Sequence, residues 1–393
     1  MQRLTGMGSL KPREWIRYSR EGVLRVGIYE DLGIKPIINA SATLTKLGGS
    51  RMPGEVLEAM HAAAGSFIDL PLFQIRVGDR IAELTWNEAA FVSSGAAGGI
   101  VLAVATLMAA PKEPDPMAYP MLKGITKDEV IVFTSQRNGY DFATLQTGAS
   151  IVACDDTLKS FESAINGRTA CLVWFAGALA VKSPPIEDVI AIAKKHHVPV
   201  LVDAAAQIPP VSNLWHYTKD LGCEGVVFSG GKGIRGPQSA GLVLGTTELI
   251  AGCRRLSPPT QGIGRPLKVG KEELAGMLAA VQYTLDQDED TILEGYEGIV
   301  QNWIKDLAGI AGVTTERGFP SEAGQPHART IVRLDAGFRK TRDQVVDELR
   351  NGDVWIEVGA PADEPNAIAL NPQTLTRGEA DVVAARLREL LTR

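Results

Sequence analysis

Long apolar runs and an excess of positive charge are both missing from this chain of 393 residues. No stretch approaches the roughly 18 uninterrupted apolar residues of a membrane-spanning helix, and residues 1–20 lack the apolar core of a signal peptide. The formal net charge of −6 argues against a broad nucleic-acid surface, which needs clustered Lys and Arg. We therefore expect a cytoplasmic protein with neither a membrane role nor a nucleic-acid partner.

Cysteine is also scarce, and its few positions are scattered. The four cysteines are Cys154, Cys171, Cys223 and Cys253, with no C-x-x-C pair among them. This spacing argues against a disulfide framework and against a zinc site, and no Cys/His pair stands at ligand spacing. We expect free thiols in a reducing compartment and no metal.

What the chain does contain is an alternation of short Val-, Ile- and Phe-rich runs with helical patterns, between about residues 55 and 245. Such alternation is typical of a mostly parallel sheet with helices on both faces. The expected strands are residues 89–93, 130–134, 150–153, 169–175, 198–202, 225–228 and 241–244. The expected helices are residues 55–64, 98–110, 186–197, 271–285 and 291–307.

The last hundred residues show a separate pattern. Strands are expected at 330–334 and 353–358, with a helix at 342–350 and a final helix opened by the capping-box pattern from Thr376 to Glu379. The predicted fold class is therefore α/β, with a seven-stranded, mostly parallel sheet in a large domain and a smaller α+β C-terminal domain. We place an N-terminal segment at 1–50, the large domain at 51–285 and the small domain at 286–393.

The most informative pattern is an aspartate at the end of an apolar strand followed by a lysine in a glycine-rich turn. Asp203 closes the run 200–203, and Lys232 follows Ser229-Gly230-Gly231. A carboxylate buried without a cationic partner is costly. The protonated ring nitrogen of pyridoxal 5'-phosphate is a sufficient partner, and that cofactor also needs a lysine for its Schiff base. We assign these roles to Asp203 and Lys232; the alternative for Lys232 is a solvated turn residue.

Residues 91–99 take a strand into a helix through small residues. Ser94, Gly95, Ala96 and Ala97 are candidates to hold the cofactor phosphate on free backbone N–H groups, although small residues also serve packing in such turns. Ser229 adds a hydroxyl to the same phosphate. Gln207 either donates to the cofactor's phenolic oxygen or caps backbone groups.

Two cations, Arg265 and Lys268, precede the helix expected at 271–285. They either belong to a solvated basic run or hold a substrate carboxylate or phosphate. Arg137, just past a strand end, is a similar candidate.

With these residues, the chain resembles the selenocysteine synthase-like (L-seryl-tRNA selenium transferase-like) group of fold-type I pyridoxal phosphate enzymes, and within it the D-glucosaminate-6-phosphate ammonia-lyase-type proteins. The motifs that carry the resemblance are Ile37-Ile38-Asn39-Ala40 with residues 43–50, residues 94–98, 203–210, 228–232 with 236–238, and 265–273. The resemblance implies Lys232 as the Schiff-base lysine and Asp203 as the pyridinium partner. It also brings Asn39 and Thr43 into the predicted substrate site.

Two departures from the group's pattern affect the expected pocket. Gln136 stands where the resemblance implies a ring-stacking histidine, so we place it against the cofactor, and Trp86-Asn87 replaces a smaller pair. Neither change removes the cofactor chemistry, but both could reshape the pocket.

The function expected is β-elimination from an amino acid or amino sugar acid. Lys232 would remove the α-proton, and loss of a β-substituent would lead to a 2-keto acid and ammonia. Alternatives are an amino-acid racemase or epimerase and an aldolase; less expected are a selenium transferase and a non-catalytic cofactor-binding regulator. We expect a small-molecule substrate and a homodimer or higher homo-oligomer.

Overall fold

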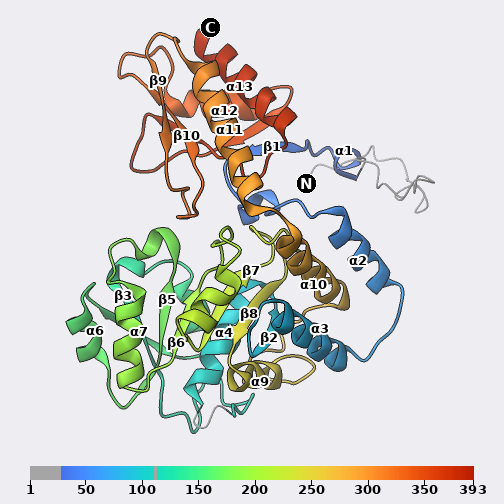
Figure 1. Ribbon diagram of the computed structural model, residues 1–393, viewed down its shortest axis with the longest axis vertical. Helices are drawn as coiled ribbons and strands as arrows, with labels where there is room; N and C mark the ends of the chain where they lie inside the picture. Colours follow the sequence, from blue (N-terminus) through green and yellow to red (C-terminus); the bar gives the residue numbers. More distant parts are fainter. Residues whose placement is uncertain (1–27, 110–112) are drawn as a thin grey trace, which may run out of the picture.

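The computed structural model describes residues 28–109 and 113–393, so the first half of the predicted 1–50 segment lies outside the described residues. Two bodies are stacked along the long axis (Figure 1). The lower one holds a seven-stranded sheet in the order β2-β8-β7-β6-β5-β3-β4, in which β8 alone is antiparallel to its neighbours. The strands are β2 (Ala89–Ser93), β3 (Glu129–Phe133), β4 (Ser150–Cys154), β5 (Thr169–Phe175), β6 (Val200–Asp203), β7 (Gly225–Ser229) and β8 (Gly241–Gly245).

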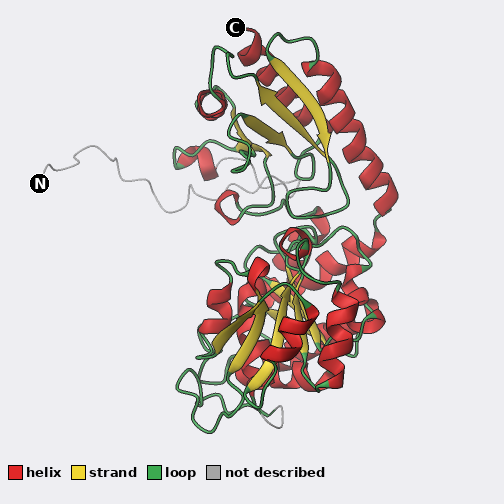
Figure 2. Cartoon of the chain, turned by 90° about the vertical axis from the view of Figure 1, so that its left-hand side faces the viewer, coloured by secondary structure: helices red, strands yellow, loops and turns green. Residues whose placement is uncertain are grey.

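All seven predicted strands of the large domain are confirmed, with ends that differ by at most two residues. Their side chains are apolar on both faces, because helices cover both sides of the sheet (Figure 2). One layer contains α4 (Gly95–Met108), α5 (Asp141–Leu145) and α9 (Thr247–Leu256). The other contains α2 (Gly54–Ala64), α3 (Leu70–Leu84), α6 (Leu158–Ala164), α7 (Ile186–Lys195) and α10 (Lys271–Asp286).

Two sizeable helices of this domain, α3 and α9, were not predicted. In α3 the buried stripe is only Val77, Gly78, Ile81 and Ala82, set among charged residues, so the apolar pattern is sparse. The helix is nevertheless well started, because the Asp69 side chain accepts a hydrogen bond from the Leu72 backbone N–H. Capping and tertiary packing decide this helix more than periodicity does.

The upper body is formed by the C-terminal part of the chain and one N-terminal strand. Its antiparallel sheet has the order β12-β10-β9 and is packed by α11 (Glu289–Leu307), α12 (Arg342–Arg350) and α13 (Arg377–Thr392). The C-terminal strands of this body are β9 (Val313–Gly318), β10 (Arg329–Leu334), β11 (Trp355–Val358) and β12 (Ala367–Leu370), of which β11 is not part of the three-stranded sheet. The predicted capping box before α13 is confirmed, whereas β9 and β12 were not foreseen.

An N-terminal strand, β1 (Ile37–Ala40), pairs in parallel with β11 of this upper body. Ala40 is completely buried in the core of the C-terminal elements. The predicted 1–50 segment is therefore not a separate unit where it is described: β1 is a strand of the C-terminal body.

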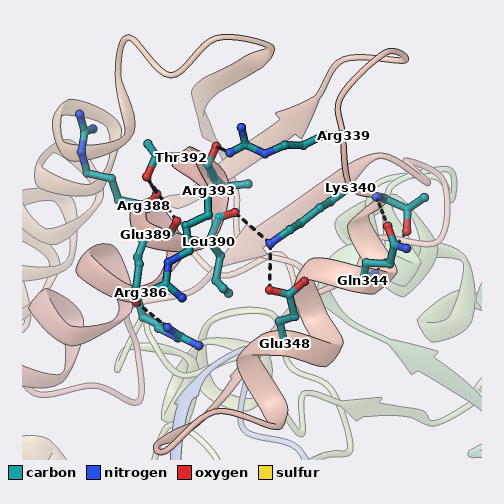
Figure 3. A network of polar contacts seen from close by, with 12 residues as sticks. Arg339, Lys340, Gln344, Glu348, Arg386, Arg388, Glu389, Leu390, Thr392 and Arg393 are labelled. Carbon is teal, nitrogen blue, oxygen red and sulfur yellow. Dashed lines mark hydrogen bonds and ion pairs between the residues drawn. The ribbon is translucent and has the colours of Figure 1, made fainter.

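A polar network closes the far end of the C-terminal body (Figure 3). Lys340 donates from Nζ to Glu348 Oε2 at 2.9 Å and to the Leu390 carbonyl at 3.3 Å. This links the loop before α12 to the last turn of α13, remote from the sheet of the large domain.

After β1 the chain returns to the large domain and crosses the turn after β7 that carries Lys232, here called the lysine turn. The Ser50 backbone N–H donates to the Gly231 carbonyl at 2.9 Å. Gly49 has φ of +75°, and a Cβ there would lie 2.5 Å from the Gly231 oxygen, so only glycine fits this crossing. Within the described residues, none of the helices combines the length and the apolar composition that a membrane span requires.

Candidate active site

Asp203 ends β6 at the carboxyl edge of the sheet, where ligands bind in open α/β folds. Its side chain is 9% exposed, and its Oδ1 accepts a hydrogen bond from the Ala205 backbone N–H at 2.9 Å. Burial raises the pKa of Asp203, against the opposing effects of the Ala205 N–H and the positive charge of Lys232. A buried carboxylate of this kind calls for a cation opposite it.

Lys232 lies in the turn after β7, partly buried and close enough to Asp203 for their charges to interact. Burial lowers the pKa of Lys232, although Asp203 acts in the opposite direction. A lowered pKa increases the neutral fraction of the amine, and the neutral amine is the form that attacks a carbonyl or accepts a proton. The predicted pairing of a strand-end carboxylate with a turn lysine is thus present in the structure.

The small-residue turn lies at the same edge of the sheet. Ser93, at the end of β2, and Ser229, at the end of β7, are both register partners of Gly241 in the intervening strand β8. The side chain of Ser94, the residue before α4, forms no capping hydrogen bond. The N–H groups at the start of this helix are therefore not capped by Ser94, and such N–H groups can bind an anion.

The close approach of α4 to β8 depends on glycine. A Cβ on Gly241 would lie 2.3 Å from the Gly95 carbonyl carbon and 2.7 Å from the Ala96 nitrogen. Gly95 itself has φ of +65°, in the left-handed region that glycine adopts readily. These two glycines place the start of α4 beside Ser229.

Gln136 is enclosed by protein in this structure. It is 0% exposed, its Oε1 accepts from the Phe175 backbone N–H at 2.8 Å, and its Nε2 donates to Ser183 Oγ at 2.9 Å. The side chain thus hydrogen-bonds the end of β5. Because Gln136 has no exposed surface in this structure, it does not offer the predicted contact with the cofactor.

Gln207 shows the second of the two roles considered for it. Its Nε2 donates to the Ala323 carbonyl at 2.9 Å, and the side chain is 7% exposed. The amide therefore caps a backbone group of the C-terminal part of the chain and joins the two bodies next to Asp203.

The five predicted substrate residues are not brought to one place. Asn39 uses both ends of its amide on backbone atoms of Ser41 and Ala42, and Arg137 is paired with Asp141. Arg265 and Lys268 are exposed. Leu267 lies between them and packs near the first turn of α4, because a Cβ on Gly98 would lie 3.7 Å from its side chain. This basic segment therefore borders residues 94–97, here called the phosphate turn.

Trp86 lies at the opposite edge of the sheet, before β2 begins. Its ring meets Trp215 edge to face with centroids 4.6 Å apart, and Lys219 lies 4.9 Å from its centroid. The expectation that Trp86 could reshape the substrate pocket is therefore wrong, because β2 separates it from the carboxyl edge.

A cavity of about 780 Å³ lies between the two bodies and reaches Lys232. Of the predicted substrate residues, only Thr43 lines it. Asp203 and Ser94 are not among its lining residues. The polar lining residues that sequence reasoning did not select include Ser50, Arg51, Arg235, Tyr283, Glu289, Tyr296, Gln373 and Arg377. No spacing rule could have found them, since they come from separate segments that meet only in the folded chain.

The residues at the carboxyl edge fit pyridoxal 5'-phosphate. Asp203 is a buried carboxylate without a side-chain hydrogen-bond donor in the described residues, which suits a protonated ring nitrogen. Lys232 is placed beside it as the amine, and the uncapped start of α4 with Ser229 suits the phosphate.

Comparisons with known proteins agree with this site. The aminotransferase class-V family model matches residues 87–269. The chain is 28% identical to the D-glucosaminate-6-phosphate ammonia lyase of Salmonella typhimurium, over 92% of this chain and 97% of that protein. It is 30% identical to the 5'-C-glycyluridine monooxygenase-decarboxylase of Streptomyces sp, over 92% of each chain.

Two further relatives extend the comparison. A solved structure of D-glucosaminate-6-phosphate ammonia-lyase has a TM-score of 0.78 at 28% identity and covers 94% of this chain and 99% of its own. The L-seryl-tRNA(Sec) selenium transferase of Geotalea daltonii is 24% identical over 65% of this chain and 58% of its own. Together with the Lys232 and Asp203 geometry, these similarities assign the cofactor as pyridoxal 5'-phosphate. The chain belongs to the selenocysteine synthase-like group of fold-type I pyridoxal phosphate-dependent enzymes.

Proposed function

We propose that this enzyme is an ammonia lyase that converts a phosphorylated amino sugar acid into a 2-keto acid and ammonia. The observation that carries the proposal is the placement of Lys232, an amine of lowered pKa, between the buried Asp203 carboxylate and a cavity rich in cations. The relatedness to D-glucosaminate-6-phosphate ammonia lyase supports the substrate class.

Pyridoxal phosphate, when bound, supplies an electron sink for the pair of electrons left when the α-proton is removed. Asp203 keeps the ring nitrogen protonated through its buried negative charge. Lys232 Nζ accepts the α-proton of the substrate. The β-hydroxyl would leave as water with the proton that Lys232 accepted, and a second water would replace the nitrogen, so the net change is substrate to 2-keto acid plus ammonia.

Proton NMR in deuterated water tests the reaction. The cofactor-loaded enzyme is incubated with D-glucosaminate 6-phosphate, its unphosphorylated form and a panel of D- and L-amino acids. Loss of the α-proton signal with appearance of a 2-keto acid is the expected result, and it should be absent in Lys232→Ala. Exchange of the α-proton with an intact carbon skeleton would instead identify a racemase, and full activity in Lys232→Ala would refute the assignment of the base.

A decarboxylating oxygenase is the second candidate, favoured by the 30% identical relative of that name. It would release the carboxyl carbon and consume oxygen, whereas the lyase does neither. A carboxyl-labelled substrate and an oxygen electrode separate the two reactions.

We also propose a homodimer or larger homo-oligomer located in the cytoplasm. Large apolar side chains with more than half of their surface exposed, among them Phe67, Met117, Met121, Tyr140 and Phe142, support a self-association surface on the large domain. The four cysteines are free and buried, which suits a reducing compartment. Light scattering on wild type and on Phe142→Glu tests the assembly: a monomeric wild type would contradict it.

A further inference from the structure

We infer that the cavity between the two bodies binds the terminal phosphate of the substrate through Arg235 and Arg377. The inference rests on the proposed function, which supplies a phosphorylated substrate. It names residues other than Arg265 and Lys268, the pair that the sequence offered as candidates for a substrate carboxylate or phosphate. The two anchoring residues come from the lysine turn and from the start of α13, one from each body.

The cavity wall carries more cationic than anionic side chains. Its cations are Lys232, Arg51, Arg235 and Arg377, while Glu289 is the one carboxylate among the lining residues identified. The Glu289 side chain already accepts a hydrogen bond from the Val211 backbone N–H. A cavity with this charge imbalance favours an anionic ligand.

Arg235 is held over the cavity in an unusual backbone conformation. Its φ is +58°, in the left-handed region where glycine is preferred, yet the chain has arginine there. Its Nη1 donates to Tyr283 Oη at 3.1 Å and its Nε donates to the Arg51 carbonyl at 3.2 Å. Arg235 forms no ion pair with a carboxylate in residues 28–109 or 113–393, so its charge is available to a ligand. Strained positions of this kind are often retained at functional sites.

Arg51 connects Arg235 to the second anchor. Its guanidinium binds both carboxylate oxygens of Glu379, at 2.9 and 2.7 Å, and the Thr374 carbonyl at 2.9 Å. Glu379 thereby compensates the charge of Arg51, and these hydrogen bonds link the two bodies. Arg377 stands two residues before Glu379 and has no ion-pair partner within the described part of the chain. Arg377 is therefore the cation that the C-terminal body contributes.

A hydroxyl group completes the polar wall. Ser50 Oγ is buried, lines the cavity and has no hydrogen-bond partner in the structure. A buried hydroxyl without a partner is unusual in a native protein. A phosphate oxygen would satisfy it.

The chemistry of these groups selects phosphate over a neutral substituent. Guanidinium groups match phosphate oxygens in a planar, two-pronged geometry, and such charged hydrogen bonds are stronger than neutral ones. The cavity volume of about 780 Å³ accommodates a six-carbon phosphorylated acid. Because Lys232, Arg235 and Arg377 line the same cavity, one ligand in it can contact the amine and the arginines together.

Binding of two non-reacting probes tests the inference. 6-Phosphogluconate and gluconate lack the amino group, so neither can undergo the reaction, and they differ only in the phosphate. Isothermal titration of the cofactor-loaded enzyme should show 6-phosphogluconate binding at least ~10-fold more tightly. Arg235→Gly and Arg377→Gln should each reduce that preference by ~5-fold or more and leave gluconate affinity unchanged.

The variants are chosen so that folding does not confuse the result. Glycine accepts the φ of residue 235, although Arg235→Gly also removes two hydrogen bonds, so circular dichroism is used to check that the variant remains folded at the temperature of the titration. Arg80→Gln, which breaks an exposed ion pair with Glu83 on α3, is the matched control and should bind both probes as wild type does. An unchanged phosphate preference in both cavity variants overturns the inference.

The outcome separates the binding site from the reaction. If 6-phosphogluconate binds in an Arg235-dependent way while D-glucosaminate 6-phosphate is not converted, the phosphate site stands and the proposed reaction falls. If the substrate is converted but the cavity variants discriminate between the probes as wild type does, the reaction stands and the phosphate is bound elsewhere.

Discussion

Replacing Gly241 by alanine should displace the phosphate turn from the sheet. A Cβ at this position would lie 2.3 Å from the Gly95 carbonyl carbon, 2.4 Å from its oxygen and 2.7 Å from the Ala96 nitrogen. Favourable contacts between such atoms begin at about 3.5 Å, so the start of α4 must move by roughly 1 Å. All three neighbours are backbone atoms, and no side-chain rotation can relieve the contact.

The displacement has two measurable costs. Overpacking of this size lowers the free energy of unfolding by about 1–3 kcal/mol. Moving the N–H groups by ~1 Å forfeits at least one charge-assisted hydrogen bond to the phosphate, worth about 1.5–3 kcal/mol. Since 1.4 kcal/mol is roughly tenfold in affinity, we expect cofactor binding to weaken by about 10- to 100-fold.

Titration of the apoenzyme with pyridoxal phosphate, followed by its visible absorbance, measures the affinity, and circular dichroism without cofactor measures stability. Gly378→Ala is the matched control, because a Cβ at residue 378 meets nothing within 4 Å and lies in α13, away from the cofactor residues. A Gly241→Ala protein that binds cofactor as tightly as wild type would refute the argument from close approach.

Three other predictions concern individual buried polar groups. Asp203→Asn should slow exchange of the substrate α-proton by ~100-fold or more, because the ring nitrogen loses its anionic partner; NMR exchange rates near wild type would contradict this. Gln136→Ala should lower the thermal midpoint, because it leaves the Phe175 N–H unpaired at a cost of about 1–3 kcal/mol. The affinity for the cofactor should be unchanged. If the affinity falls while the thermal midpoint does not, Gln136 contacts the cofactor after all. Burial alone would raise the pKa of Glu357, but hydrogen bonds from Arg350, Lys46 and Trp355 lower it from 4.5 to about 2. The ionised Glu357 therefore contributes fully to the free energy of unfolding above pH 4.5, and this contribution is lost as the pH falls toward 2. Glu357→Gln should lack this pH-dependent loss of stability. An identical acid-unfolding profile in wild type and variant would contradict the prediction.

The sheet and the pairing of Asp203 with Lys232 were predictable because both depend on local sequence patterns. Apolar strands buried on both faces read as continuous runs, and parallel strands end at one edge, so Asp203 had to lie near the turn that carries Lys232. The start of α4 was predictable for the same reason, since a strand followed by small residues and a helix exposes N–H groups whatever surrounds it.

The roles of the two glutamines were not predictable in this way. Gln136 and Gln207 stand beside the site in sequence, but their amides bind Ser183, the Phe175 N–H and the Ala323 carbonyl. A polar side chain takes the partner that the fold brings to it, and that partner can be more than a hundred residues away. Sequence spacing identifies the amide but not its hydrogen bonds.

The sequence by itself determined the cofactor chemistry and the large sheet, because strand periodicity and the order of Asp203, Ser229 and Lys232 act over short distances along the chain. Only the tertiary structure decided that β1 belongs to the C-terminal body and that Arg235 and Arg377 face one cavity. The physical reason is that the cavity forms where segments from both bodies meet. Its charge and shape arise from packing between those segments, which no local pattern encodes.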